Sequence, residues 1–167
     1  YSLYMSYLVA ALEEDAGFTP AHASAVYALV GGAIVFGGVL FGRLSDRVGR
    51  RATMVSGYLV KAACAALVLA GAEPWAAISA VFFGLVMSGL GAVTAAHVAD
   101  HLDSRSFGTA FGVVTLVFGI AQVVGPQLGG WLADVTGSFT VGFVVSALAA
   151  LFGALSSATL PRAPVRA

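Results

Sequence analysis

The chain contains 167 residues, of which 59% are hydrophobic and 10% are charged, and its mean hydropathy is +0.95. A soluble domain usually contains about 25% charged residues, so this composition indicates an integral membrane protein. The formal net charge is zero. Because no basic surface is available to neutralise phosphates, the composition argues against a nucleic-acid partner.

Six apolar segments follow one another along the chain, and we predict an α-helix for each. A membrane-spanning helix needs about 20 apolar residues. The first segment is long enough only for the last part of such a helix, so the chain is expected to begin inside it. The predicted fold is an all-α integral membrane bundle over residues 1–161 with five complete transmembrane helices, followed by a short tail at residues 162–167. The predicted helices cover residues 1–12, 21–42, 52–70, 75–98, 108–133 and 139–160, the fifth being interrupted at Gly125 and Pro126.

The distribution of the arginines predicts the orientation of the bundle. Alternate connections and the tail contain Arg43, Arg47, Arg50, Arg51, Arg105, Arg162 and Arg166, whereas the opposite connections contain no Lys or Arg. The positive-inside rule places the arginine-bearing side in the cytoplasm. Trp75 and Trp131 then lie at the outer interface, where indole rings are common. We therefore expect a multi-pass protein of the cell inner membrane with a cytoplasmic C-terminus.

Residues 42–51, with the sequence GRLSDRVGRR, form the densest charged segment of the chain. We predict a short turn here between the second and third helices. Asp46 is close enough in sequence to pair with Arg43, Arg47 or Arg50 and hold the turn closed. The alternative is that the arginines anchor the protein to anionic lipid. That alternative accounts for the arginines but not for Asp46 or the glycines.

This segment resembles the signature loop of the major facilitator superfamily, which lies between the second and third helices of a six-helix half. Residues 41–47, 118–122 and 136–139 are similar to a poorly characterised bacterial branch that resembles monocarboxylate porters. The resemblance implies half of a secondary active transporter that moves a small organic solute by alternating access. The implied partners are the lipid bilayer, the missing half and the substrate. The implied latch, which closes against the other half in the outward-open state, consists of Gly42, Arg43, Asp46, Arg47, Gly49, Arg50 and Arg51.

Two features bear on which half the chain represents. A short tail after the sixth helix favours the C-terminal half, so that the missing partner is the N-terminal half. Residues 125–130, with the sequence GPQLGG, instead resemble an element on the fifth helix of antiporters in this superfamily. Ala121 stands where that pattern has a glycine.

The glycines also predict how the helices pack. Gly38 and Gly42 on the second helix, and Gly125 and Gly129 around Pro126 on the fifth, have the spacing of closely packed membrane helices. The second and fifth helices are therefore expected to make the closest contacts.

Lys61 lies in the middle of the third predicted helix, where a cation costs about 2.5–3.5 kcal/mol. Two interpretations stay open: contact with a substrate or proton, or a structural lysine that is buried or reaches toward the interface. Gln122 on the fifth helix lies at a similar depth as a candidate hydrogen-bond partner. No Asp or Glu lies at that depth, so a proton-carrying carboxylate would have to come from the missing half, and the coupling ion stays open.

The resemblance implies that the first and fourth helices line a central cavity. The candidate lining residues are Tyr1, Tyr4, Phe83, Met87 and Ser88, with packing as the alternative for each. The sequence has no metal-ligand spacing, phosphate-binding loop or nucleophile–base pair, so we expect neither an enzyme nor a cofactor. A stand-alone membrane protein with a structural or assembly role is the alternative function.

Overall fold

A computed structural model describes residues 1–161 and is entirely helical apart from short connections. Five of its helices are long and apolar enough to cross a membrane, which confirms the predicted all-α membrane fold. The remaining helix, α1, is shorter. The helices are α1 (Ser2–Glu14), α2 (Pro20–Val48), α3 (Arg50–Val68), α4 (Glu73–His101), α5 (Ser104–Thr136) and α6 (Thr140–Thr159). The predicted tail at 162–167 lies outside the described residues.

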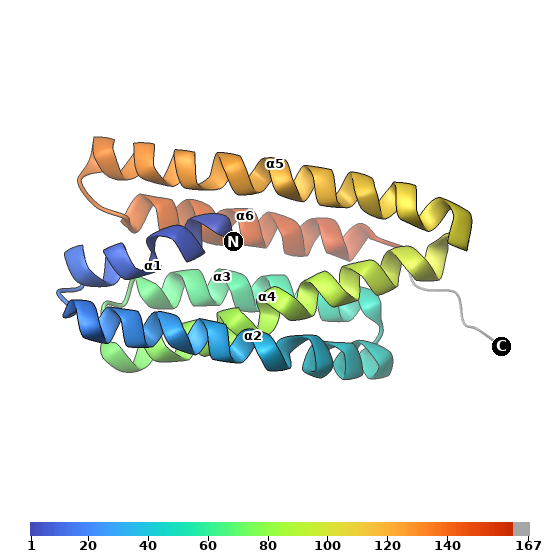
Figure 1. The fold of residues 1–167 in the computed structure, drawn as a ribbon, viewed down its shortest axis with the longest axis horizontal. Coiled ribbons are helices and arrows are strands. Elements are labelled where there is room, and N and C mark those ends of the chain that lie inside the picture. Colours follow the sequence, from blue (N-terminus) through green and yellow to red (C-terminus); the bar gives the residue numbers. More distant parts are fainter. Residues whose placement is uncertain (162–167) are drawn as a thin grey trace.

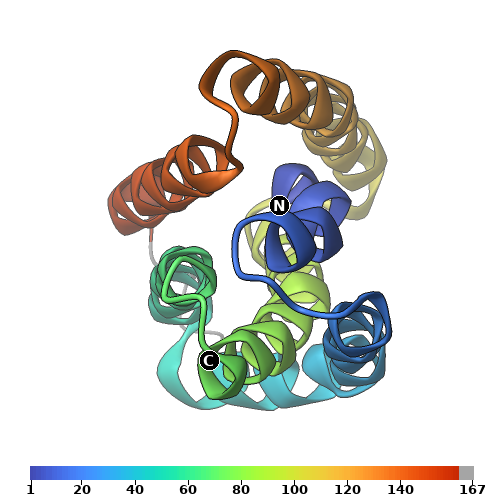
Figure 2. The same cartoon turned by 90° about the vertical axis from the view of Figure 1, so that its left-hand side faces the viewer.

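The helices lie side by side along the long axis of the molecule, and consecutive helices run in opposite directions (Figure 1). The connections after α1, α3 and α5 therefore lie at one end, and those after α2 and α4 lie at the other, which we call the Arg50 end. The most extensive contacts join α2 to α4 and α3 to both α6 and α4. Viewed from the end opposite Arg50, α1 lies between α5 and the pair formed by α2 and α4 (Figure 2).

Local signals in the sequence determine where several helices begin and end. Thr19 caps α2 by accepting a hydrogen bond from the backbone N–H of His22, and Pro20 follows at the first helical position. Asp103 caps α5 in the same way, with 2.8 Å between its Oδ1 and the backbone nitrogen of Ser106. Gly137 ends α5 in the left-handed conformation, at φ +71°.

The predicted turn at 42–51 is wrong in extent, because most of this segment is helical. The helix α2 continues to Val48 and α3 begins at Arg50, so Gly49 alone separates them. Likewise, the predicted connection at 99–107 shortens to residues 102–103. The physical reason is that charged residues mark the edge of the apolar span, whereas a helix can continue beyond that edge into water. The predicted interruption at Pro126 is also absent, since α5 continues through it.

Glycines allow α2 and α4 to approach each other closely. A Cβ atom on Gly37 of α2 would collide with the backbone carbonyl of Leu85 on α4, and one on Gly84 of α4 would collide with the carbonyl of Val30 on α2. Only glycine fits at such a crossing. Within the described residues, α2 packs most extensively on α4, and α5 packs on α1.

The individual glycines that were expected to pack divide into two groups. Gly125 and Gly129 approach the side chains of Ser2, Leu3 and Tyr7 on α1. Gly38 and Gly42 contact no other helix of the described residues, since an added Cβ on either would meet no atom within 4 Å, and their packing stays a prediction. Within the bundle the contact residue on α2 is Gly37, one position away from Gly38.

Tyr4 fixes α1 to the core of the bundle. Its side chain is fully buried and stacks on Phe83 of α4 with ring centroids 3.7 Å apart. Its hydroxyl lies 2.6 Å from the hydroxyl of Ser79, which in turn donates to the backbone carbonyl of Cys64 at 2.8 Å. This chain of hydrogen bonds satisfies the buried polar groups and joins α1, α4 and α3.

Candidate functional site

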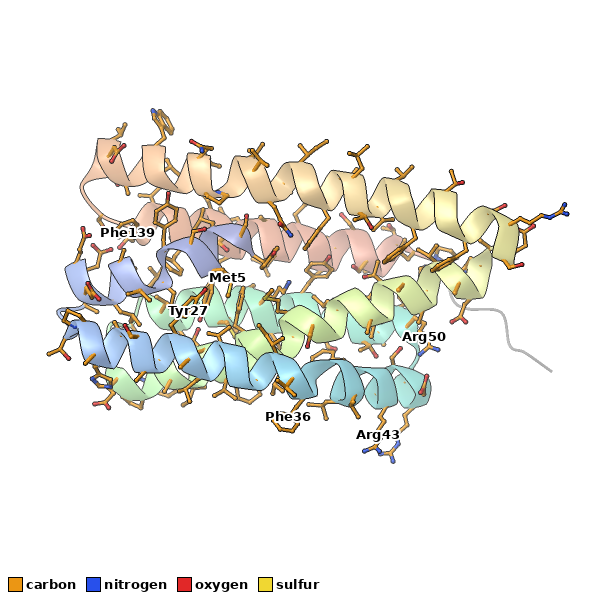
Figure 3. All side chains as sticks on the ribbon, in the orientation of Figure 1. Met5, Tyr27, Phe36, Arg43, Arg50 and Phe139 are labelled. Carbon is orange, nitrogen blue, oxygen red and sulfur yellow. The ribbon has the colours of Figure 1, made fainter. Side chains whose placement is uncertain are left out.

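Arg50, the first residue of α3, connects three helices at one end of the bundle. Its Nη1 donates to Asp46 Oδ1 at 2.6 Å and to Ser45 Oγ at 2.8 Å, both on α2. Its Nε donates to Asp100 Oδ2 on α4 at 3.0 Å. We call Ser45, Asp46, Arg50 and Asp100 the Arg50 cluster; Arg50 is labelled in Figure 3, where the ends of α2, α3 and α4 meet. A guanidinium suits this role because its donors point in several fixed directions.

The local backbone brings Arg50 back over the end of α2. Gly49 has a φ of +92°, a conformation that side chains with a Cβ rarely adopt, and its N–H donates to the carbonyl of Ser45 at 3.0 Å. The chain therefore reverses within one residue. Arg50 consequently faces Ser45 and Asp46, which lie on the preceding helix.

The two ion pairs of the Arg50 cluster differ in their access to water. The side chains of Arg50 and Asp100 are 21% and 20% exposed, whereas that of Asp46 is 66% exposed. Solvent screens the exposed pair strongly, and such pairs contribute little to stability. The bond between Arg50 and Asp100 is therefore the stronger structural connection, and Asp46 is the member that water or another molecule can reach.

Sequence reasoning found one carboxylate of this cluster and missed the other. Of the three arginines proposed for Asp46, the structure brings Arg50 to it. Arg43 and Arg47 are exposed, and within residues 1–161 neither forms an ion pair; Figure 3 shows Arg43 pointing away from the bundle. Asp100 was assigned to a loop. The signal that could have identified it is its place near the end of α4, on the same side of the membrane as the arginines.

A second polar site lies in the interior of the bundle. A cavity of about 310 Å³ is lined by residues of α1, α3, α4, α5 and α6. Four predicted site residues line it together, namely Tyr1, Lys61, Phe83 and Gln122. The ammonium of Lys61 lies 5.6 Å from the ring centroid of Tyr1 and 5.8 Å from that of Phe83. We call this space the Lys61 cavity.

Three residues that were candidates for lining a cavity lie elsewhere. Tyr4 is part of the buried hydrogen-bond chain described above, and Met87 packs against the same core. Ser88 donates to the backbone carbonyl of Ile34 on α2 at 2.7 Å. Helical spacing correctly places each residue on its helix, but it does not show which neighbouring helix that residue faces.

Two aromatic residues of the Lys61 cavity were missed. Tyr58 precedes Lys61 by three residues on α3, and its ring centroid lies 5.9 Å from the ammonium. Phe118 precedes Gln122 by four residues on α5 and stacks on Tyr1 with centroids 5.3 Å apart. Spacings of three and four residues place side chains on the same helix face, so these neighbours could have been found by extending the faces of Lys61 and Gln122.

Comparison with known proteins identifies the family. The family model described as Major Facilitator Superfamily matches residues 1–167. The chain belongs to the major facilitator superfamily. The chloramphenicol resistance protein CraA of Acinetobacter baumannii is 34% identical over 144 residues, which are 84% of this chain and 34% of that protein. Monocarboxylate transporter 12-B of Danio rerio is 25% identical over 146 residues, which are 84% of this chain and 31% of that protein.

A third relative, the class C tetracycline resistance protein of Escherichia coli, is 28% identical over 116 residues, or 68% of this chain and 29% of that protein. The chain thus spans about a third of the length of these relatives. Membership of this superfamily, whose members are transporters and not enzymes, shows a multi-pass membrane protein. Among residues 1–161, no group of three His, Cys, Asp or Glu side chains could hold a metal ion.

Proposed function

We propose that this chain forms the C-terminal six-helix half of a secondary active transporter, which moves a small organic solute by alternating access between two halves. The observation that carries the proposal is the Arg50 cluster, which joins the ends of α2, α3 and α4 within the segment that resembles the signature loop. The length of the chain, about a third of its relatives, supports the view that a partner half is needed.

We place the protein in the cell inner membrane. The arginines support an orientation in which the Arg50 end faces the cytoplasm. Arg43, Arg47, Arg50 and Arg51 lie at this end, as does Arg105 near the start of α5. The described connections at the opposite end, residues 15–19, 69–72 and 137–139, contain no Lys or Arg. The positive-inside rule then makes the Arg50 end cytoplasmic, and α6 ends on the same side.

The outward faces of α2 and α5 are the surfaces proposed to pack against the other half. Val35, Phe36 and Val39 on α2 are more than 60% exposed, and Figure 3 shows Phe36 pointing away from the bundle. Gly38 and Gly42 are spaced for the same face of α2 as Val35 and Val39. Because nothing in the described residues lies within 4 Å of a Cβ at either glycine, that face has room for a helix of another unit to approach closely.

The proposed latch then has a fixed part and a free part. Arg50 and Asp100 hold the cytoplasmic ends of α3 and α4 together. Asp46, Arg43 and Arg47 remain exposed and are available to bind polar groups of the other half when the cytoplasmic side closes. Release of these contacts would favour the inward-open state, since contacts made in only one of two states shift the population between them.

Proton coupling through a carboxylate would require a group outside this part of the chain. Between the two ends of the bundle, the described helices carry no Asp or Glu at the depth of Lys61. A carboxylate that binds and releases a proton during transport would therefore come from the partner half.

The test uses the full-length transporter in proteoliposomes and a panel of labelled organic solutes, with and without a pH gradient. Asp46→Asn is expected to lower the transport rate several-fold while leaving membrane insertion unchanged, because the arginines still determine the orientation. Asp103→Asn is the matched control, since Asp103 lies on the same side and outside the Arg50 cluster. Wild-type transport by Asp46→Asn would leave lipid anchoring as the role of this segment. A correctly folded full-length protein that transports no solute of the panel would favour a structural role.

A further inference from the structure

Lys61 is held in the interior of the bundle without a counter-charge from the described residues. It follows the first residue of α3 by 11 positions and precedes the last by seven, so at 1.5 Å per residue it is about 16 Å and 10 Å from the two ends. Within residues 1–161, no carboxylate forms an ion pair with its ammonium. No hydrogen bond to that ammonium is present in the same part of the chain.

Three aromatic rings surround this ammonium instead. The centroids of Tyr1, Phe83 and Tyr58 lie 5.6, 5.8 and 5.9 Å from it and belong to α1, α4 and α3. The negative faces of aromatic rings attract a cation at such distances. The rings therefore hold the ammonium within the cavity, away from the ends of α3. Among residues 1–161 no acceptor binds its three N–H donors, and a group that is both anionic and an acceptor would satisfy them.

We propose that the Lys61 cavity is a binding site for a small organic anion, whose carboxylate accepts hydrogen bonds from the ammonium of Lys61. Gln122 lines the cavity from α5 and offers an amide N–H₂ as a second donor. Phe118 and Tyr1, which stack on each other, provide an apolar wall for the body of the ligand. The volume of about 310 Å³ is at the lower end of the range for sites of small molecules, about 300–1,000 Å³.

The chemistry of the lining also excludes other classes of ligand. An organic cation would be repelled by Lys61, and a neutral apolar molecule would leave the donors of its ammonium unsatisfied in a region of low dielectric. An anion removes both penalties, since charge-assisted hydrogen bonds are stronger than neutral ones. The inference names the substrate class of the proposed transporter and so rests on the proposed function, although binding itself can be measured without transport.

The test measures the thermal stability of the purified full-length transporter in detergent with two small carboxylates, benzoate and butyrate. Each is compared with its neutral amide, benzamide or butyramide. At least one carboxylate is expected to raise the unfolding temperature in a concentration-dependent manner, and its amide is not. Lys61→Gln is expected to weaken carboxylate binding about 10- to 100-fold, the effect of losing a hydrogen bond to a charged group. Arg105→Gln, which removes an exposed cation outside the cavity, is expected to leave binding unchanged.

Three results would overturn the inference: no stabilisation of the wild type by either carboxylate, equal stabilisation by the amides, or carboxylate binding that survives Lys61→Gln. A carboxylate side chain from the rest of the transporter could occupy the cavity, and this would also produce the first result. If Lys61→Gln does not fold, Gln122→Leu provides the second variant, with weaker binding expected and unchanged binding refuting the role of the cavity. A protein that binds benzoate through Lys61 but transports no solute would refute the proposed function alone.

Discussion

The bond between Arg50 and Asp100 predicts a measurable loss of stability when Asp100 is replaced by Asn. This substitution keeps the size of the side chain and removes the negative charge that lies 3.0 Å from Nε of Arg50. Both side chains are about four-fifths buried, with exposures of 21% and 20%. Water can therefore replace the lost charge only in part, and the guanidinium is left with a neutral amide oxygen, a weaker acceptor than a carboxylate.

The expected magnitude follows from this partial burial. A hydrogen bond to a charged group contributes about 1.5–3 kcal/mol, whereas breaking a fully buried ion pair costs about 3–5 kcal/mol. Because the pair of Arg50 and Asp100 is not fully buried, we expect Asp100→Asn to lower the free energy of unfolding by about 1.5–3 kcal/mol. Asp46→Asn is expected to lower it by less than about 1 kcal/mol, because the exposed Asp46 forms a screened pair.

The two substitutions therefore separate stability from transport. Asp46→Asn is expected to impair transport with little effect on unfolding, while Asp100→Asn lowers stability in the absence of any solute. The assay is unfolding of the full-length transporter in detergent, for each variant alone and combined with Arg50→Gln. A double-mutant cycle isolates the energy of each pair from other effects of the substitution.

The control for this experiment is Asp103→Asn. Asp103 is near Asp100 in sequence but caps α5, and Asn is as good a cap as Asp, so no destabilisation is expected. The reasoning would be refuted if Asp100→Asn were no more destabilising than Asp103→Asn. A coupling energy between Arg50 and Asp100 no larger than that between Arg50 and Asp46 would refute it equally.

Two further predictions concern packing in the bundle. Gly37→Leu should destabilise the full-length protein by about 1–3 kcal/mol, because the new side chain would meet the Leu85 carbonyl on α4. Gly91→Leu is the control with little expected effect, because an added Cβ there meets no atom of the described residues within 4 Å. Equal unfolding temperatures for the two variants would contradict the crossing of α2 and α4. Tyr4→Phe should cost about 0.5–1.5 kcal/mol, the contribution of the buried hydrogen bond to Ser79. Unfolding measurements that show no greater loss than for the half-exposed Tyr27→Phe would contradict that bond.

The fold could be predicted from composition because a bilayer restricts the possible structures. Every backbone polar group in hydrocarbon must be satisfied within the segment, so a long apolar stretch such as that around Val35 has to be a helix. The ends of the helices were less predictable. Ser45, Asp46 and Asp100 lie beyond the apolar spans, where polar side chains are compatible with either a loop or a continuing helix, and the structure shows helix at all three.

Within the Arg50 cluster, Asp46 could be predicted as a partner of Arg50 from the sequence, whereas Asp100 could not. Asp46 and Arg50 are four residues apart, so a short turn between them keeps the two side chains within reach of each other. Asp100 is 50 residues from Arg50, and its contact depends on how α4 crosses α2. That crossing is determined by Gly37 and Gly84, where the backbones touch. Sequence spacing alone did not distinguish Gly37 from its neighbour Gly38, so the partner of Arg50 could not be deduced.

The surroundings of Lys61 show the limit of sequence reasoning most clearly. Its depth in the membrane follows from its position along α3. Gln122, the candidate hydrogen-bond partner at that depth, lines the same cavity, although within residues 1–161 no hydrogen bond joins it to Lys61. The direction in which the Lys61 side chain points does not follow from the sequence. A lysine on a membrane helix can face lipid, an interface or the interior with the same residues around it. The aromatic rings that hold it come from α1 and α4 as well as from α3. Tyr4 stacks on Phe83 of α4 and is linked through Ser79 to the carbonyl of Cys64 on α3. These contacts join the three helices whose rings surround Lys61 and make it part of a cavity.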